Sequence, residues 1–141
     1  MTVDELNAAV NHPDVLPFVA EGYVRVDMAP FLANPKNVAL RRGSGVMIFA
    51  HVGNGFYDGH LLFPMDCPDK LQKARDMISE LFTQHDAHVI TGTISRQRRA
   101  ARFFTRALGF ENTGSQTDPD GCETVSYRMT RDQWERLSAD W

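Results

Sequence analysis

Two periods of hydrophobic spacing divide this chain into predicted helices and predicted strands. Apolar residues recur at helical spacing from Asp69 to His85, which predicts a helix with one buried face. Before it, three short runs rich in β-branched and aromatic residues are separated by glycine-rich turns. This pattern predicts an antiparallel meander. Its strands are Asn37 to Arg41, Val46 to Val52 and Phe56 to Phe63.

A strand, a basic helix and a hairpin follow the long helix. Ala87 to Ile94 is predicted as the strand, and the helix after it ends at Leu108-Gly109-Phe110. Gly109 is placed for a left-handed C-terminal cap, with Phe110 making the accompanying hydrophobic contact. The predicted apolar stripe of the helix is Ala100, Phe103, Phe104, Ala107 and Leu108, and Arg98, Arg102 and Arg106 fall four apart on another face. The hairpin strands are Glu111 to Gln116 and Cys122 to Met129, joined over Asp118-Pro119-Asp120-Gly121.

Both ends of the chain carry capping-box patterns. Thr2 with Glu5 begins a first helix, and Thr130 with Gln133 begins a last one. Between the first helix and the meander, two prolines limit residues 14–22 to a short helical turn. The remaining predictions there are a short strand from Tyr23 to Met28 and a loop from Ala29 to Lys36.

This order of elements predicts one α+β (α/β) domain over residues 1–141. It reads as helices, an antiparallel meander, then β-α-β-α and a C-terminal hairpin. Because helical connections flank one strand, part of the mixed sheet should be parallel.

Composition narrows the class of protein. The chain has 43% hydrophobic and 23% charged residues and a net charge of −3, so bulk charge does not recruit nucleic acid. Arginines cluster at 96–106, so this segment could still bind an anionic partner locally. The longest apolar runs fall short of a membrane helix and the N-terminus is polar, so we expect a cytoplasmic protein with no membrane association. Cys67 and Cys122 fit no metal or disulfide framework, and we expect no metal site.

The strand, the basic helix and its Leu-Gly-Phe ending resemble the C-terminal half of the GNAT N-acetyltransferases. In that family, a helix of the form Asn-x-x-Ala…Tyr-x-x-x-Gly-Phe packs beside acetyl-CoA. The order of elements is also similar, from the first helix to the last strand. The basic helix looks similar to GNAT-like proteins of phages and prophages too. The resemblance implies a GNAT-like fold and acetyl transfer from acetyl-CoA to an amine of a small molecule or protein.

The resemblance also implies where the coenzyme lies. The family's fourth strand matches Tyr57 to Phe63, and it splays from a partner that matches His88 to Thr93. Pantetheine would pair with the backbone of Leu61, Leu62 and Phe63 like an extra strand. Gly59 lies mid-strand, where glycine marks a bulge or a close backbone approach. A family member aims a backbone amide from this point at the thioester oxygen.

The chain departs from the family where the coenzyme's phosphates bind. The pyrophosphate loop, Gln/Arg-x-x-Gly-x-Gly/Ala, matches Asp69, Lys70, Leu71, Gln72, Lys73 and Ala74, of which only Ala74 fits. Asp69 brings negative charge to a helix start that should attract phosphate, and the two lysines partly offset it. Arg98 replaces the family's Asn, and Thr105 its frequent Tyr. Arg98, Arg99 and Arg102 are the arginines placed to meet phosphates.

Asp58 and His60 are the candidate bases. They lie two apart on a strand and therefore share one face. A symmetric turn at Gly53-Asn54-Gly55 sets Asp58 opposite Ala50, sets His60 opposite Ile48 and places His51 and Tyr57 on the other face. Either Asp58 or His60 could take the amine's proton. The proton for the leaving thiolate would come from Tyr57, Tyr127, Cys67 or water.

Two rival functions stay open at this stage. The departures in the pyrophosphate loop favour a GNAT-fold binding or structural protein that has lost its coenzyme. Nucleic-acid binding by the arginine helix is disfavoured, because the net charge is negative and Phe103 and Phe104 are predicted core residues. The acceptor is open, and so is the oligomeric state, with a homodimer among the alternatives.

Overall fold

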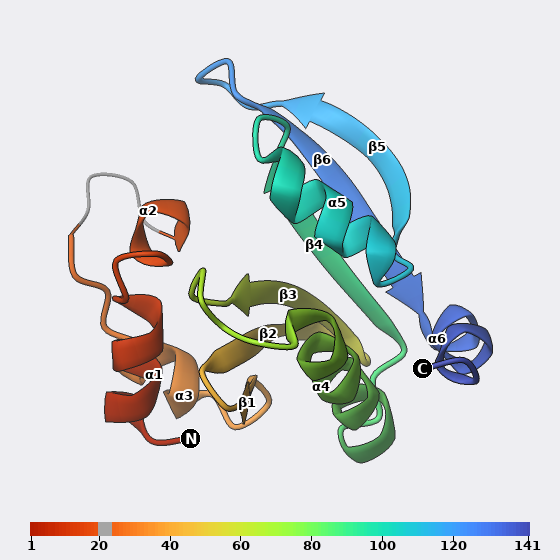
Figure 1. Cartoon of the computed structure of the whole chain (residues 1–141), viewed down its shortest axis with the longest axis horizontal. Coiled ribbons are helices and arrows are strands. Elements are labelled where there is room, and N and C mark those ends of the chain that lie inside the picture. The colour runs from red at the N-terminus through yellow and green to blue at the C-terminus, as the bar shows by residue number, and fades with distance from the viewer. Residues whose placement is uncertain (20–23) are drawn as a thin grey trace.

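The computed structural model describes residues 1–19 and 24–141, which form six helices and six strands within these ranges (Figure 1). In chain order they are α1 (Val3–Val10), α2 (Leu16–Val19), α3 (Ala29–Ala33), β1 (Val38–Arg42), β2 (Gly45–Gly53), β3 (Phe56–Leu62), α4 (Lys70–Gln84), β4 (Val89–Ser95), α5 (Arg99–Ala107), β5 (Glu111–Thr117), β6 (Glu123–Thr130) and α6 (Arg131–Ser138). None of the helices in the described ranges is both long and apolar enough to cross a membrane.

One mixed sheet holds all six strands, in the order β1-β2-β3-β4-β6-β5. β3 and β4 are parallel, and every other neighbouring pair is antiparallel. The meander, the parallel crossover through α4 and the C-terminal hairpin are therefore all present. The predicted fold class is confirmed.

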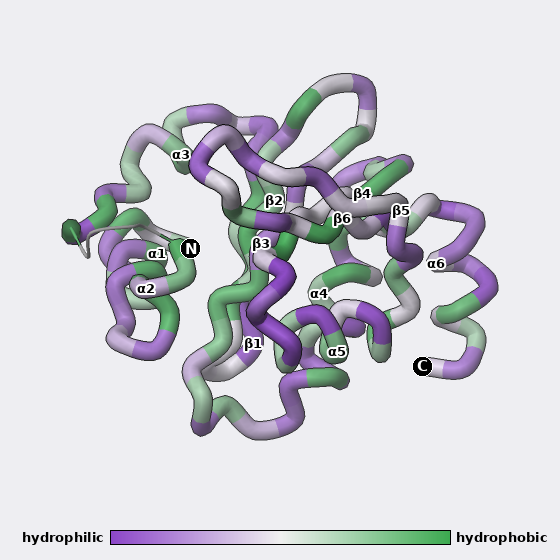
Figure 2. Tube along the Cα trace, turned by 90° about the horizontal axis from the view of Figure 1, so that it is seen from above, coloured by the Kyte–Doolittle hydropathy of each residue, from purple (hydrophilic) through white to green (hydrophobic). Residues whose placement is uncertain are grey.

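Two apolar clusters lie on opposite faces of the sheet. On one face, Phe49 and Tyr57 pack with the buried side of α4, Leu108 of α5 and Met129 of β6. On the other face, Ile48 and Leu62 pack with α1 and α3. Figure 2 shows α4 and α5 on the same side of the strands. Because side chains alternate across a strand, each position in β2 and β3 is assigned to one cluster or the other.

The predicted caps hold the helix ends. Thr2 with Glu5 and Thr130 with Gln133 both form capping boxes. At the end of α5, Gly109 has φ +101°, and the amide of Phe110 donates to the carbonyl of Thr105 at 3.3 Å. A methyl group on Gly109 would come within 2.5 Å of Leu137. Glycine is therefore required there both by the positive φ and by the lack of space.

The N-terminal segment differs from two predictions. Residues 24–28 form no strand, because their backbone pairs with side chains of the α1 region. Asn11 bonds both the N–H and the C=O of Val26, and Asn7 accepts from the amide of Met28. Residues 29–33 form α3 where a loop was predicted, since Pro30 is tolerated in a first helical turn. Tyr23 and residues 20–22, which belong to these predictions, lie outside the described residues.

Candidate active site

β3 and β4 start as neighbours and then diverge (Figure 1). Their parallel pairing ends at Asp58, which lies opposite Thr91. Beyond this point β3 stays paired with β2 as far as Leu62, while β4 stays paired with β6 as far as Ser95. No described strand covers the edge of β3 at residues 59–62. The expected splay is confirmed, and we call the diverging region of β3 and β4 the fork.

Gly59 lies where the fork opens. Gly59 pairs with Phe49 in a regular ladder, so the prediction of a bulge at Gly59 is wrong. The irregularity between β2 and β3 lies instead between His51 and Gly53. A methyl group on Gly59 would come within 3.2 Å of Phe49 and 3.3 Å of Ile90. These distances are shorter than ordinary side-chain contacts. Glycine at this position therefore leaves room for the side chains of Phe49 and Ile90 just before β3 and β4 separate.

Asp58 and His60 form a pair beside the fork. Asp58 lies opposite Ala50 and His60 opposite Ile48, so the predicted register is confirmed. Nε2 of His60 is 3.2 Å from Oδ2 of Asp58, and their side chains are 51% and 37% exposed. The other carboxylate oxygen of Asp58 is 3.5 Å from the hydroxyl of Thr91. The carboxylate is thus held between the imidazole and β4, and the imidazole remains open to solvent.

Tyr57 lies on the opposite face of β3, as predicted. Its ring is buried and meets His51 edge-on, with ring centroids 5.3 Å apart. Burial, with a smaller effect of the negative charge on Asp86, raises the pKa of the Tyr57 hydroxyl. Tyr57 therefore keeps its proton at neutral pH.

The first turn of α4 presents backbone amides with no side-chain cap. Asp69 precedes it in a left-handed conformation, with φ +52° and ψ +42°, and its carboxylate does not bond the helix amides. Such an end attracts an anion, although the charge on Asp69 opposes a phosphate.

The side chains of that turn are largely committed elsewhere. Leu71 and Ala74 pack with the core, and Gln72 donates to Asp76 at 2.8 Å. The ammonium of Lys73 lies 3.8 Å from the buried thiol of Cys67. An anion here would therefore meet chiefly the backbone and Lys70.

Arg98 is separated from the other arginines of its helix. Its guanidinium stacks on the ring of Phe18 in α2, 3.9 Å from the ring centroid, and burial lowers the pKa of Arg98. The predicted shared face of Arg98, Arg102 and Arg106 is wrong. The reason is that Arg98 is the N-cap, with φ −85° and ψ +73°, so helical spacing does not extend to it.

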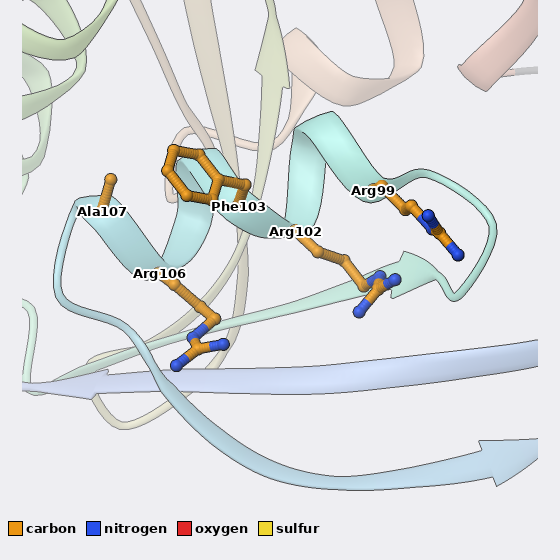
Figure 3. A pocket seen from close by; sticks show the side chains of 5 residues that line it. All are labelled: Arg99, Arg102, Phe103, Arg106 and Ala107. Carbon is orange, nitrogen blue, oxygen red and sulfur yellow. The ribbon is translucent and has the colours of Figure 1, made fainter.

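The face that the arginines do share belongs to Arg99, Arg102 and Arg106 (Figure 3). Phe103 lies among them and is 78% exposed, and Ala100 and Ala107 are exposed too. The predicted apolar stripe is therefore wrong in these three positions. The buried side of α5 instead includes Thr105. Its hydroxyl donates a hydrogen bond to the carbonyl of Ala101, so burying this polar group costs little free energy.

Several solved structures are similar to the chain over most of its length. A GNAT-family acetyltransferase from Bacillus anthracis aligns with a TM-score of 0.70 at 16% identity, covering 94% of this chain and 92% of its own. Aminoglycoside acetyltransferase AAC(6′)-Ib in complex with coenzyme A and kanamycin aligns at 0.68 with 18% identity, covering 95% and 92%. A variant of spermidine N-acetyltransferase SpeG from Vibrio cholerae aligns at 0.65 with 9% identity, covering 79% and 75%. The chain has the GNAT fold.

At these identities the similarity concerns the GNAT fold itself. No family profile and no curated protein matches the sequence.

Two contacts around the fork had no signal in the sequence. Thr91 meets Asp58 only because β4 lies in parallel register with β3. Phe63, just after β3, meets Phe104 of α5 edge-on, with ring centroids 6.1 Å apart. These contacts bound the fork, with strand pairing at one end and the Phe63–Phe104 pair at the other. Arg106 lies with Arg99 and Arg102 on one side of α5, and no ligand role was predicted for it from the sequence.

Proposed function

We propose that this protein is an acyl-CoA-dependent N-acetyltransferase whose reaction takes place at the fork. The observation that carries the proposal is the separation of β3 from β4 immediately after Asp58 and Thr91, in a chain with the GNAT fold. Structures of AAC(6′)-Ib similar to this chain contain coenzyme A or acetyl-CoA. The acceptor here is an amine of a small molecule or a protein. We place the activity in the cytoplasm, where thiols such as Cys67 stay reduced.

The chain offers two groups of contacts to acetyl-CoA. The open edge of β3, with the backbone of Leu61, Leu62 and Phe63, suits the amides of pantetheine, which would pair like an added strand. The uncapped amides at the start of α4, with Lys70, suit the pyrophosphate. In this proposal Arg98 stays with Phe18 and lends positive charge at a distance.

The base is His60, and Asp58 orients it. An amine attacks the thioester carbonyl, so that a C–N bond forms while the C–S bond breaks. The proton leaves the amine nitrogen for the imidazole of His60, which the carboxylate of Asp58 holds at 3.2 Å. A backbone amide on the β3 edge stabilises the negative charge that develops on the thioester oxygen. The leaving thiolate takes a proton from water, and the hydroxide that remains takes the proton held by His60, which regenerates the base. Tyr57 is a poor donor because it is buried and its pKa is raised.

An assay of thiol release from acetyl-CoA tests the proposal. The purified protein is offered a panel of amines: a polyamine, an aminoglycoside, a lysine-containing peptide and a peptide with an unmodified N-terminus. We expect release with at least one amine and its loss in His60→Gln. Release by His60→Gln at the wild-type rate, or no release with any amine, would contradict the proposal.

A second candidate is a GNAT-fold protein that binds a partner without catalysis. The first turn of α4 favours it, because Asp69 replaces a basic or amide residue and Gln72 replaces a glycine. This candidate predicts a fully folded protein whose melting temperature does not respond to millimolar acetyl-CoA. The acetyltransferase predicts stabilisation of about 2.7 kcal/mol at a hundred times the dissociation constant.

A further inference from the structure

The outer face of α5 forms a cationic surface apart from the fork. Arg99, Arg102 and Arg106 line a pocket there together with Phe103 and Ala107, and Figure 3 shows these side chains on one side of the helix. Phe104, which meets Phe63 at the fork, is two positions from Arg102 and so lies about 200° from it around the helix. A ligand on this surface, which we call the arginine face, therefore leaves the fork accessible.

The positive charge of the arginine face is not neutralised within the described part of the chain. None of its three arginines forms an ion pair with a described carboxylate, whereas the neighbouring Arg96 pairs with Glu123 at 3.4 Å. Nε of Arg102 is buried and has no acceptor among the described residues. Arginines left without carboxylates favour an anionic partner, and guanidinium groups match phosphate oxygens well.

An exposed aromatic ring lies among these charges. Phe103 is 78% exposed, although a large apolar side chain is normally buried when a core is available. In the structure Phe103 is exposed instead of lying in the predicted core, so its ring is accessible for stacking, whereas Phe104 stays packed against Phe63. A ring exposed between arginines can stack on a base whose phosphates the arginines contact.

A second pocket continues the surface towards the β4–α5 loop and the β5–β6 turn. Its lining includes Arg96 and Gln97 besides Arg99 and Arg102, and the carboxylates of Asp120 and Glu123, of which Glu123 is paired with Arg96. These carboxylates would repel a phosphate as well as an acidic side chain, so of the two polyanions only a nucleic acid can lie beside them, with a base and not a phosphate at this end. They can accept hydrogen bonds from the exocyclic amines of bases. The mixture of arginines, an aromatic ring and acceptors at one end therefore favours nucleic acid over an acidic protein segment.

We propose that the arginine face binds single-stranded nucleic acid. Phe103 stacks on a base, and Arg99, Arg102 and Arg106 contact successive phosphates. The three arginines rise along the helix in steps of about 4.5 and 6 Å, so a short strand can follow the axis of α5. This binding does not depend on the acetyltransferase proposal, since it uses the opposite side of α5.

Fluorescence anisotropy with a labelled thymidine dodecamer tests the inference. Three phosphate contacts on a single strand predict a slope of about −2 for the logarithm of the association constant against the logarithm of salt concentration. Phe103→Ala should weaken binding by about 5- to 150-fold with the slope unchanged. Arg102→Ala should weaken binding and reduce the slope by about 0.7.

Matched variants and competitors make the result decisive. Phe56→Ala, another exposed phenylalanine, and Arg136→Ala on α6 should bind the dodecamer as the wild type does. Because Phe103 is exposed, its variant should melt at the wild-type temperature, which circular dichroism checks.

Displacement of the dodecamer by polyglutamate at equal charge would overturn the proposal in favour of an acidic protein partner. Displacement by saturating coenzyme A would assign the arginines to the coenzyme, and wild-type binding by Phe103→Ala would also overturn it.

Discussion

Nε2 of His60 lies 3.2 Å from Oδ2 of Asp58, at the point where β3 leaves β4. The second oxygen of the same carboxylate lies 3.5 Å from the hydroxyl of Thr91, so Asp58 is positioned from both strands of the fork. The imidazole projects into solvent from this support. This geometry suits a base that is held in orientation and is still reached by an acceptor amine.

Replacing the two members of this pair should affect catalysis unequally. We expect His60→Gln to lower kcat/KM for acetyl transfer by about 100-fold or more, as loss of a general base does. Asp58→Asn should cost less, because it leaves the base in place with poorer orientation. His85→Gln, an exposed histidine at the end of α4, is the control and should have no effect. A larger loss in Asp58→Asn than in His60→Gln would transfer the role of base to the aspartate.

Gly59 and Gly92 face each other across the opening of the fork and should respond differently to alanine. In Gly59→Ala, the new methyl group would crowd Phe49 and Ile90 at 3.2 and 3.3 Å, and we expect a loss of about 1–3 kcal/mol in the free energy of unfolding. In Gly92→Ala the nearest atom is the carbonyl oxygen of Gly59 at 3.6 Å, an ordinary contact, so the loss should stay within about 0.5 kcal/mol. Urea denaturation of both variants gives the comparison, and equal losses would show that Gly59 is not a point of close approach.

Local signals in the sequence predicted most of the fold. The capping boxes at Thr2 and Thr130, the glycine at 109 and the alternation in β2 and β3 each act within a few residues, and all are confirmed. The prediction of a short strand from Tyr23 to Met28 was wrong over residues 24–28, because the side chains of Asn7 and Asn11 supply the hydrogen bonds of this backbone. Nothing local in residues 24–28 reveals that distant partner.

The candidate site was only partly visible in the sequence. Asp58 and His60 follow from strand alternation, but Thr91 joins them through parallel register between strands far apart in the chain. In α5, helical spacing predicted that Phe103 lies in the core. In the structure the helix packs through the side that carries Ala101, Thr105 and Leu108, and Phe103 is exposed. Periodicity gives the existence of a face, and only the packing partner decides which residues lie in it.

Asp69 should weaken the affinity for the coenzyme, because its charge lies at the uncapped start of α4. Asp69→Gly removes that charge and suits the left-handed backbone at φ +52°. We expect the dissociation constant for acetyl-CoA to fall about two- to fivefold by calorimetry. Asp132→Asn in the first turn of α6 is the charge-matched control and should leave the constant unchanged. An unchanged affinity in Asp69→Gly would place the phosphates elsewhere.

Tyr57 should make the protein sensitive to alkali. Burial first, and then the charge on Asp86, raise the pKa of its hydroxyl above the ordinary value of 10.0. The folded state therefore holds this proton more tightly than the unfolded chain does. The resulting stability is fully present below a pH of about 10 and is lost as the pH rises through the folded pKa. In urea denaturation from neutral pH to pH 11, about one unit above the ordinary pKa, the wild type should lose stability more steeply than Tyr57→Phe. Parallel curves for the two proteins would count against this account.

The most direct test of the account is a crystal structure of the protein grown with coenzyme A. We predict pantetheine between β3 and β4, paired with the backbone of Leu61, Leu62 and Phe63, and pyrophosphate at the first amides of α4. Coenzyme bound instead to Arg99, Arg102 and Arg106, or no coenzyme between β3 and β4 at millimolar concentration, would contradict the central claim.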